Sequence, residues 1–398
     1  MPALARRVLD LRQSDIRAIT ALVREVDGLN LGQGVCDMPT PDPVKVAACA
    51  AIEGDRSIYS HYAGVQALRE AIWHKATTYN RLPAASPEEV LVSAGSTGAF
   101  VTAIHALLEP GDEVILFEPF YGYHQNLIKL IGAVPVAVPL HGPDWEVDLD
   151  QVRQAVTPRT KAVLVCTPAN PSGKVWTRAE LEGLLTILEA HDLYAITDEI
   201  YEYMVYDGHE HVSLASLPGA YARTLTLSGL SKTYNMTGWR MGYAVGPLAL
   251  IEKMGLVNDL LYVCAPTPLQ VGSVAAFEMG AAYTDALRAT YAVKRTMLCE
   301  ALERIGWAFS WPQGAYYVLA SFAPLQARRP GFEEAQAACR TLIHEAGVAA
   351  IPGPSFFANP ADGAHLLRFC YAKEDDVLAQ ACQQLVEALG EVGAASPL

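Results

Sequence analysis

Residues 89–119 read EVLVSAGSTGAFVTAIHALLEPGDEVILFEP, and this stretch decides the fold class. Its first part, EVLVSAG (89–95), is a short apolar run typical of a buried strand, and EVILFEP (113–119) has the same character. Between them, TGAFVTAIHALLEPG (97–111) has the length of a helix and ends at Pro-Gly, which stops one. A strand, a helix and a strand in this order predict two parallel strands joined by a crossover helix.

The same alternation continues along the chain. We expect further strands at VPVAVPL (134–140), KAVLVCTP (161–168), LYAITDEIY (193–201), TLTLSGL (224–230) and MGYAVGP (241–247), with helices at 14–27, 43–53, 64–80, 121–132, 177–191 and 248–260. Short apolar runs that alternate with helices predict a mainly parallel sheet covered on both faces. After about residue 290 the pattern changes, and the expected elements indicate a smaller α+β domain: a helix at 285–305, AYYVLASF (315–322), a helix at 332–346 and LLRFCYA (366–372).

Composition narrows the classes of function. The chain has 398 residues and a net charge of −14, which disfavours nucleic acids and anionic membranes as partners. The N-terminal stretch lacks the apolar run of a signal peptide, and no segment is apolar over the length of a membrane span. The eight cysteines are scattered and the ten histidines form no metal-ligand pattern. We therefore expect a cytoplasmic protein without a metal site.

Lys232 is the first candidate for chemistry, because ligands in open α/β sheets bind at the carboxyl ends of the strands. It follows the strand expected at 224–230, in SGLSK. An amine that attacks a carbonyl must be neutral, which burial and a nearby positive charge favour. Arg240 can supply that charge, and its guanidinium can bind a phosphate. A surface lysine after a strand is the alternative, and in isolation it is the more common case.

Polar residues follow two other expected strands. Asp198 ends a strand, where a buried acid can hold the proton of a ring nitrogen, although capping a helix or turn is the alternative. Tyr201 can reach the same ring or be an ordinary half-buried tyrosine. Asn170 lies in PANPSG, where prolines restrict the backbone, so that its amide can point at a ligand oxygen. Plain turn chemistry explains Asn170 equally well.

Three further features suit an anionic or planar ligand. Gly95, Ser96 and Thr97 join a strand to a helix, and the free N–H groups at a helix start bind anions. Tyr121 follows another strand and can stack on a planar ring, although aromatics in such places as often belong to the core. Arg368 lies within an apolar strand, where its guanidinium needs either a substrate carboxylate or a structural salt bridge.

As a set, these segments resemble the class I/II aminotransferases of the fold type I pyridoxal-phosphate family, which includes aspartate aminotransferase and the kynurenine- and methionine-type enzymes. The resemblance covers about residues 29–390 and rests on segments that occur in the family's order: LGQGVCDMPTP, YSHYAGVQALREAI, PANPSGKVW, TDEIYEYMVYDG, SGLSKTYNMTGWRMGY, PQGAYYV and HLLRFCYA. Most of these motifs are unspecific alone, but their joint order is highly specific.

The resemblance implies a catalytic role for several residues. Lys232 resembles the lysine that forms a Schiff base with pyridoxal 5′-phosphate and then moves the substrate proton. Asp198 resembles the partner of the pyridine nitrogen. Tyr201 and Asn170 resemble the pair that binds the phenolic oxygen of the cofactor.

Other roles concern binding. The resemblance implies a phosphate cradle of Gly95, Ser96, Thr97 and Arg240, with Tyr121 stacked on the ring. Arg368 resembles the clamp of the substrate α-carboxylate, with the backbone of Gly34 opposite. Tyr59 resembles a tyrosine that reaches the phosphate of the neighbouring subunit, which implies a homodimer with shared active sites.

The sequence departs from the family pattern near the lysine. Gly229 occupies a position often held by a phosphate-binding serine, and Ser228 or Ser231 are the candidates to replace it. Tyr121 stands where Trp or Phe is more common, which still permits stacking. Cys36 stands where relatives often have proline or tyrosine, and the sequence offers no physical account of it.

We therefore expect an α/β fold with a large domain, residues 44–285, whose mainly parallel seven-stranded sheet is sandwiched by helices. A smaller α+β domain is built from both termini, residues 1–43 plus 286–398. The expected activity is ping-pong transfer of an amino group from an L-amino acid to a 2-oxo acid. Some aspartate-using relatives carry lysine where this chain has Thr97, which favours a neutral donor, aromatic or sulfur-containing.

Two other functions fit parts of the sequence. The first is another pyridoxal-phosphate enzyme of the same fold, either a β-lyase or a carbon–carbon synthase. A β-lyase would release pyruvate and ammonia without a 2-oxo acid acceptor. A ligand-sensing module of a DNA-binding regulator is the other, but it needs basic recognition elements, which this acidic sequence does not show. A dinucleotide-binding dehydrogenase is disfavoured, because no GxGxxG follows the early strands.

Overall fold

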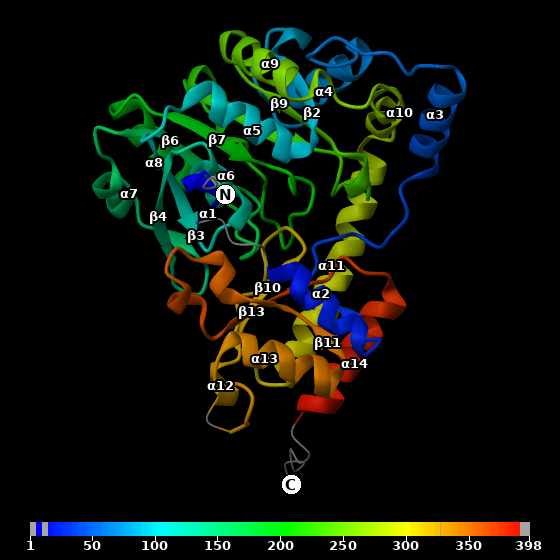
Figure 1. Ribbon diagram of the computed structural model, residues 1–398, viewed down its shortest axis with the longest axis vertical. Coiled ribbons are helices and arrows are strands. Elements are labelled where there is room, and N and C mark those ends of the chain that lie inside the picture. Colours follow the sequence, from blue (N-terminus) through cyan, green and yellow to red (C-terminus); the bar gives the residue numbers. More distant parts are fainter. Residues whose placement is uncertain (1–4, 10–14, 327, 391–398) are drawn as a thin grey trace.

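The computed structural model describes residues 5–9, 15–326 and 328–390. It has a large part built around one extended sheet and a smaller part below it, and the long helix α11 (Gly280–Arg304) runs from one to the other (Figure 1). Helix α2 (Asp15–Glu25) packs in the smaller part with the C-terminal elements, whereas the first described helix, α1 (Arg6–Leu9), lies against α6 (Gly122–Leu130) of the large part (Figure 1).

The large sheet has the strand order β2-β9-β8-β7-β6-β3-β4-β5. Its strands are β2 (Val90–Ala94), β3 (Glu113–Glu118), β4 (Val134–His141), β5 (Glu146–Val147), β6 (Thr160–Cys166), β7 (Tyr194–Asp198), β8 (Thr224–Gly229) and β9 (Met241–Val245). The pairs from β8 to β4 are parallel, whereas β9 is antiparallel to both of its neighbours and β5 is antiparallel to β4. The expected mainly parallel sheet is confirmed; the eighth strand is the two-residue β5 at the edge, too short to show in a hydrophobic pattern.

Helices cover both faces of this sheet, because alternate residues of its strands are apolar on both sides. In β3, Val114 and Leu116 pack under one layer of helices, while Ile115 and Phe117 pack under the other. The first layer consists of α5 (Gly95–Leu107), α6 (Gly122–Leu130) and α9 (Leu248–Tyr262). The second consists of α4 (Gln66–Thr78), α7 (Leu149–Ala155), α8 (Arg178–Ala190) and α10 (Thr267–Glu278), and α3 (Asp42–Glu53) packs on α10.

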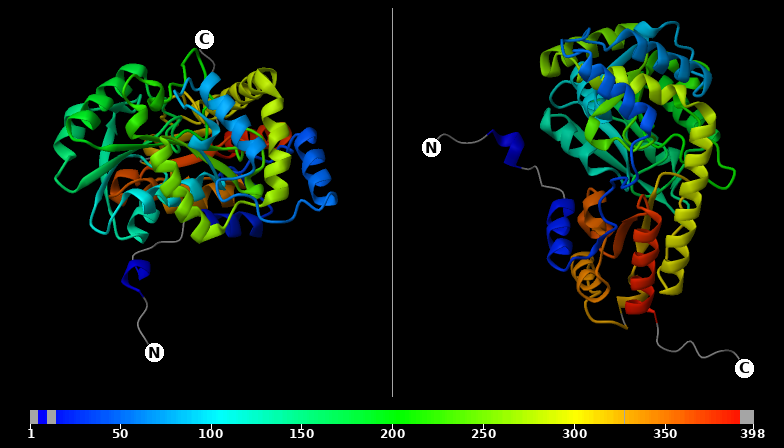
Figure 2. Two further views of the ribbon diagram at one scale, coloured as in Figure 1. Left: turned by 90° about the horizontal axis from the view of Figure 1, so that it is seen from above. Right: turned by 90° about the vertical axis from the view of Figure 1, so that its right-hand side faces the viewer.

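The smaller part is built on a three-stranded antiparallel sheet and a two-stranded parallel one. The first has the order β10 (Tyr317–Ser321), β13 (Leu366–Cys370), β12 (Ile351–Pro352); the second pairs β1 (Leu29–Asn30) with β11 (Val348–Ala349). Helices α12 (Ala323–Gln326), α13 (Ala335–Thr341) and α14 (Asp375–Leu389) belong to it, and α14 lies alongside α11 (Figure 2). One hydrophobic core joins these elements to Ile19, Val23 and Leu31 of the N-terminal segment.

Several elements differ from the sequence expectations. Helices α10 and α14 were not predicted. The helix expected at 332–346 is α13 followed by one π-helical turn, Leu342–Ala346, which ends at Gly347 with a left-handed φ of 64°. Among the described residues, no helix combines the length and the apolar character that crossing a membrane requires.

Candidate active site

The predicted site residues come together at the carboxyl edge of the large sheet, where it faces the smaller part. Each stands at or just after the end of a strand: Gly95–Thr97 after β2, Tyr121 after β3, Asn170 after β6, Asp198 and Tyr201 after β7, and Lys232 after β8. Gly34 and Arg368 reach the same place from the smaller part. This is the position that the topology of an open α/β sheet favours for a ligand.

Lys232 is held by a contact across the two parts of the chain. Its Nζ donates a hydrogen bond to the Gly34 carbonyl oxygen at 3.0 Å. The hydroxyl of Tyr316 donates to the same oxygen at 3.1 Å, and the ring of Tyr316 has its centroid 5.5 Å from Nζ. The amine therefore points toward the N-terminal segment, and Tyr316 fixes the carbonyl that receives it.

The environment of Lys232 favours its neutral form. Burial lowers the pKa of the Lys232 amine from its ordinary value. The thiols of Cys36 and Cys370 act in the opposite direction on this pKa, and the positive charges of Arg368 and Arg240 lower it further. A lowered pKa raises the fraction of the amine that is neutral, and the neutral form is the one that attacks a carbonyl.

Asp198 is a buried carboxylate with a histidine behind it. Its Oδ2 lies 3.1 Å from His124 Nε2, and its Oδ1 accepts a hydrogen bond from the Ile200 backbone N–H at 3.3 Å. The Tyr121 ring packs edge-on against His124, with centroids 5.3 Å apart. His124 was missed by the sequence analysis; its place in the first turn of α6, three residues after Tyr121, indicates that it lies near the site but does not indicate Asp198 as its partner.

Tyr201 lies in a group of buried tyrosines. Its hydroxyl is 3.1 Å from the hydroxyl of Tyr317, a residue of β10 that sequence reasoning did not single out. Burial raises the pKa of Tyr201, and it raises that of Tyr317 to about 12, so both hydroxyls stay protonated near neutral pH. Each hydroxyl therefore keeps a proton to donate, and the contact with Tyr317 orients the Tyr201 hydroxyl.

Arg368 is 1% exposed and connects the two parts of the chain. It donates from Nη1 to the Asn170 side-chain oxygen and from Nη2 to the Gly32 carbonyl oxygen, both at 2.8 Å. Its guanidinium also lies over the Tyr317 ring, 4.3 Å from the centroid. Its buried Nε has no hydrogen-bond partner among the described residues. An anion beside this guanidinium would satisfy both the charge and the free donor.

Glycines shape a cradle for an anion at the start of α5. A Cβ on Gly95, which has a φ of 76°, would overlap with the Arg240 guanidinium, and a Cβ on Gly242 would overlap with the backbone of Gly95 and Ser96. The Arg240 side chain therefore lies directly against the N-terminus of a thirteen-residue helix. Free backbone N–H groups and a guanidinium converge there, as a phosphate requires.

The structure also explains the glycine that departs from the family pattern. A Cβ on Gly229 would lie 2.8 Å from the Met241 carbonyl oxygen and 3.0 Å from Gly242 Cα, so a serine would not fit without a shift of the backbone. The hydroxyl of Ser228 donates to Glu202 at 2.9 Å, which removes this residue from the candidates for the phosphate contact. Ser231, which is buried next to Lys232, remains a prediction.

Tyr59 and Cys36 are the two remaining positions that the sequence analysis singled out. Tyr59 is 79% exposed, so within this chain it is not part of the site. Cys36, for which the sequence gave no account, is buried, with its Sγ 3.3 Å from the Tyr291 hydroxyl. It packs the N-terminal segment against α11.

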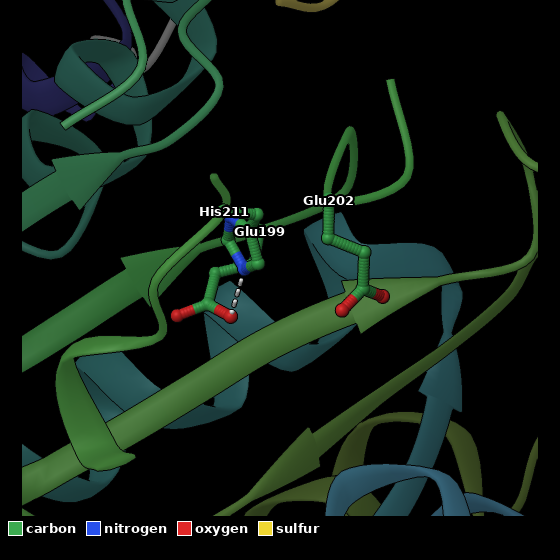
Figure 3. A group of neighbouring side chains, drawn as sticks. All are labelled: Glu199, Glu202 and His211. Atoms are coloured by element: carbon green, nitrogen blue, oxygen red, sulfur yellow. Dashed lines mark hydrogen bonds and ion pairs between the residues drawn. The ribbon is translucent and has the colours of Figure 1, made fainter. Parts of the chain in front are cut away.

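A second polar cluster lies behind the turn that carries Asp198 and Tyr201. Glu199, Glu202 and His211 bring ligand-type atoms within 4.8 Å of one another (Figure 3). Protein groups already bind these atoms: Glu199 accepts from Ser213 at 2.8 Å and lies 3.0 Å from His211 Nε2, and Glu202 forms a buried ion pair with Lys75. The Lys75 ammonium is the cation of this cluster, and no metal site is inferred.

Comparison with known proteins agrees with this geometry. A family model described as aminotransferase class I and II matches residues 26–385. The chain belongs to this family. Members of this aminotransferase family use pyridoxal phosphate. The expected family, fold class and enzyme class are thereby confirmed.

Relatives of this aminotransferase carry different substrate names. It is 36% identical to a probable N-succinyldiaminopimelate aminotransferase, DapC, of Mycobacterium tuberculosis, over 92% of this chain and 94% of that one. The solved structure of the M. tuberculosis enzyme gives a TM-score of 0.91 at 35% identity and covers 97% of this chain and 100% of that one. The aspartate/prephenate aminotransferase of Thermus thermophilus is 36% identical over 98% and 100% of the two chains. Kynurenine–oxoglutarate transaminase 1 of Mus musculus is 30% identical over 97% and 98%.

Proposed function

We propose that this aminotransferase binds pyridoxal 5′-phosphate through Lys232 and moves the amino group of a neutral L-amino acid to a 2-oxo acid by a ping-pong mechanism. One observation carries the proposal. The partly buried Lys232 amine, with its lowered pKa, stands at the carboxyl edge of the large sheet together with Asp198, Tyr201 and the Asn170–Arg368 pair. Nucleophile, acid, donor and carboxylate clamp are thus assembled in one place.

The residues present fit this cofactor. The cradle of Gly95 and Arg240 suits its phosphate, and the buried carboxylate of Asp198 suits its ring nitrogen. The phenolic oxygen would be held by Tyr201 and Asn170, and Tyr121 would stack on the ring. When bound, the cofactor would supply a conjugated ring that takes up the electron pair released at the substrate α-carbon.

Each side chain then has a defined task. Lys232 Nζ takes the proton from the α-carbon and returns it, a general acid–base step usually worth about 10²- to 10⁴-fold in rate. Asp198, oriented by His124, keeps the ring nitrogen protonated. Arg368 binds the α-carboxylate and thereby places the α-carbon near Lys232.

The neutral donor rests on the charges around the site. A second substrate carboxylate, buried there, would need its own cation. The three basic side chains described at this site already have tasks: Lys232 as the nucleophile, Arg240 at the phosphate cradle and Arg368 as the carboxylate clamp. Position 97 is threonine, and the nearby wall is aromatic, with Tyr121 and Tyr123 stacked at 5.1 Å between centroids. Apolar walls of this kind suit aromatic or sulfur-containing side chains.

The test is an absorbance spectrum of the purified enzyme before and after a panel of amino acids is added. A visible band that is absent in Lys232→Ala would support the linkage. Its bleaching by phenylalanine, methionine, leucine or kynurenine, reversed by a 2-oxo acid, would support transamination from neutral donors. Thr97→Lys should raise the ratio of aspartate to phenylalanine turnover. Aspartate turnover in wild type far above that of the neutral donors would overturn the neutral-donor proposal.

A homodimer is part of the proposal. Asn258 of α9 donates to the Tyr62 carbonyl oxygen at 2.9 Å, which brings the segment of Ile58 and Tyr59 close to α9. Leu260 on α9 is 85% exposed and Ile58 is 81% exposed. Exposed apolar side chains grouped in this way indicate a protein interface.

Sedimentation of the enzyme should therefore show a dimer that Leu260→Glu weakens. Val293→Glu, at an exposed position of α11, is the matched control and should sediment like wild type. A monomeric wild type would refute the dimer. We also propose a location in the cytoplasm, which the eight free cysteines support, because thiols stay reduced there.

A further inference from the structure

A cavity of about 340 Å³ lies against Glu202 and Tyr203, the two residues that follow Tyr201, and Lys232 is not part of its lining. Its lining comes from four segments: the last residue of α4 and the three that follow it (78–81), Arg178 at the start of α8, residues of the loop 202–216, and Arg288 of α11. Its volume lies in the range of small-molecule sites, which begins at roughly 300 Å³. Neither the catalytic residues nor the cofactor cradle belongs to its lining.

The cavity is positively charged although the chain as a whole is acidic. Arg81, Arg178 and Arg288 line it, in a chain with a net charge of −14. In the described part of the chain, Arg81 and Arg178 have no hydrogen bond or ion pair. Arg288 has only a surface pair with Asp285, one turn away on its own helix, at 2.5 Å.

The acidic residues of the lining do not cancel these charges. Glu202 is neutralised by the buried Lys75, and Asn80 donates to its carboxylate at 2.7 Å. Burial alone would raise the pKa of Glu202, but the charges of Lys75 and His211 lower this pKa overall. The Lys75–Glu202 pair therefore stays ionised. Glu210 is the remaining carboxylate of the lining, which also holds three guanidinium groups. A concave surface with this excess concentrates anions.

The other walls suit a ligand larger than a simple ion. The rings of Tyr79 and Tyr203 pack together with centroids 4.4 Å apart. The side chain of His211 is only 3% exposed, and its Nε2 lies 3.0 Å from Glu199, which fixes the ring. We propose that this cavity binds a small polyanion, a molecule with two or more phosphate or carboxylate groups, through Arg81, Arg178 and Arg288. Guanidinium groups bind both kinds of anion with paired hydrogen bonds.

The place of the cavity in the fold connects it to catalysis. Glu202 and Tyr203, which line it, follow Tyr201 directly and stand in the turn that begins at Asp198. A polyanion bound there would contact the back of the turn whose front carries the catalytic side chains. The site is thus separate from the substrate site but shares one rigid segment with it.

The experiment is calorimetric titration of the holoenzyme with pyrophosphate, and separately with citrate, at about 0.15 M salt to screen weak surface binding. We expect saturable binding of one ligand per chain by at least one of the two probes. Tighter binding of pyrophosphate would indicate a phosphate-bearing ligand, and tighter binding of citrate a polycarboxylate. The double variant Arg81→Gln/Arg178→Gln should bind at least about tenfold more weakly, because it loses two charge-assisted contacts.

A charge-matched control separates this site from general attraction. Arg153→Gln/Arg340→Gln removes the same charge at exposed positions of α7 and α13 and should bind like wild type. Equal affinity of both double variants, or no saturable binding of either probe to wild type, would overturn the proposal. Since Arg81 and Arg178 are exposed, their loss should leave the melting temperature unchanged. The titration needs no turnover, so its outcome is independent of the proposed amino donor.

Discussion

Replacing Arg368 with lysine tests the carboxylate clamp while it preserves the charge. The guanidinium offers two Nη donors and a free Nε, whereas an ammonium at the end of a shorter side chain offers one nitrogen. The variant should therefore lose about one charge-assisted hydrogen bond to the substrate, worth about 1.5–3 kcal/mol. At about 1.4 kcal/mol per factor of ten, this corresponds to a loss of about 10- to 150-fold in kcat/KM. Most of the loss should appear in KM, since the carboxylate is bound both before and during the reaction.

The assay is the first half-reaction with phenylalanine and with its methyl ester, which has no anionic carboxylate. Arg368→Lys should lose its factor only with the free acid, and the resting spectrum should be unchanged because the charge near Lys232 remains. Arg340→Lys, an exposed position on α13, is the control and should match wild type with both substrates. An equal loss with acid and ester would refute the clamp and leave Arg368 with a structural role only. A loss of less than threefold with the acid would refute it too.

Three further predictions concern the buried polar groups. Lys75→Met should lower the free energy of unfolding by about 3–5 kcal/mol in a denaturant titration, because it leaves the buried Glu202 carboxylate unpaired. The control Lys45→Met breaks the exposed pair with Asp42 and should lower the free energy of unfolding by less than about 1 kcal/mol. The pKa of Lys232 is lowered in the folded apoprotein, so the unfolded state binds more protons between the folded and unfolded pKa values. The stability of the wild type relative to Lys232→Met should therefore rise with pH in that window, by at most about 1.4 kcal/mol per pH unit. A stability difference that does not change with pH would contradict this. Tyr317→Phe removes the hydroxyl that orients the Tyr201 hydroxyl, so Tyr201 should be a weaker donor to the cofactor. The midpoint of the pH-dependent visible band should then rise by up to about one pH unit. An unchanged midpoint would contradict a role for the Tyr201–Tyr317 contact.

The sequence was sufficient to predict the sheet and the residues at its carboxyl edge. Each strand of the large sheet except β5 is an apolar run of five to eight residues, and such runs stand out between helices. Lys232, Asp198 and Asn170 were accessible because each lies at the end of such a run or shortly after it, so their convergence is a consequence of topology alone. The structure confirms that topology, and the roles of these residues remain to be tested.

What the sequence could not predict are contacts between elements that are distant along the chain. His124 stands behind Asp198 and Tyr317 stands beside Tyr201, and nothing in the local pattern of either residue indicates its partner. The buried Lys75 is a further example, since a lysine near the end of a helix is normally exposed. Helices such as α10, with apolar residues on most sides, lack the amphipathic stripe by which a surface helix is found.

The arrangement of side chains at the end of β7 and in the turn after it gives a reason for keeping the buried Lys75–Glu202 ion pair. Asp198 and Tyr201 belong to the candidate active site and contact His124 and Tyr317, whereas Glu199 and Glu202 are bound by His211 and Lys75. Burying an ion pair contributes little net stability compared with a well-packed apolar pair. Its geometry, however, holds the turn in one conformation, and catalytic groups must be placed within about 0.5 Å. On this reasoning the network positions Asp198 and Tyr201, and Lys75→Met should lower kcat even under conditions where the variant is fully folded. A folded variant with unchanged kcat would show that the pair serves stability alone.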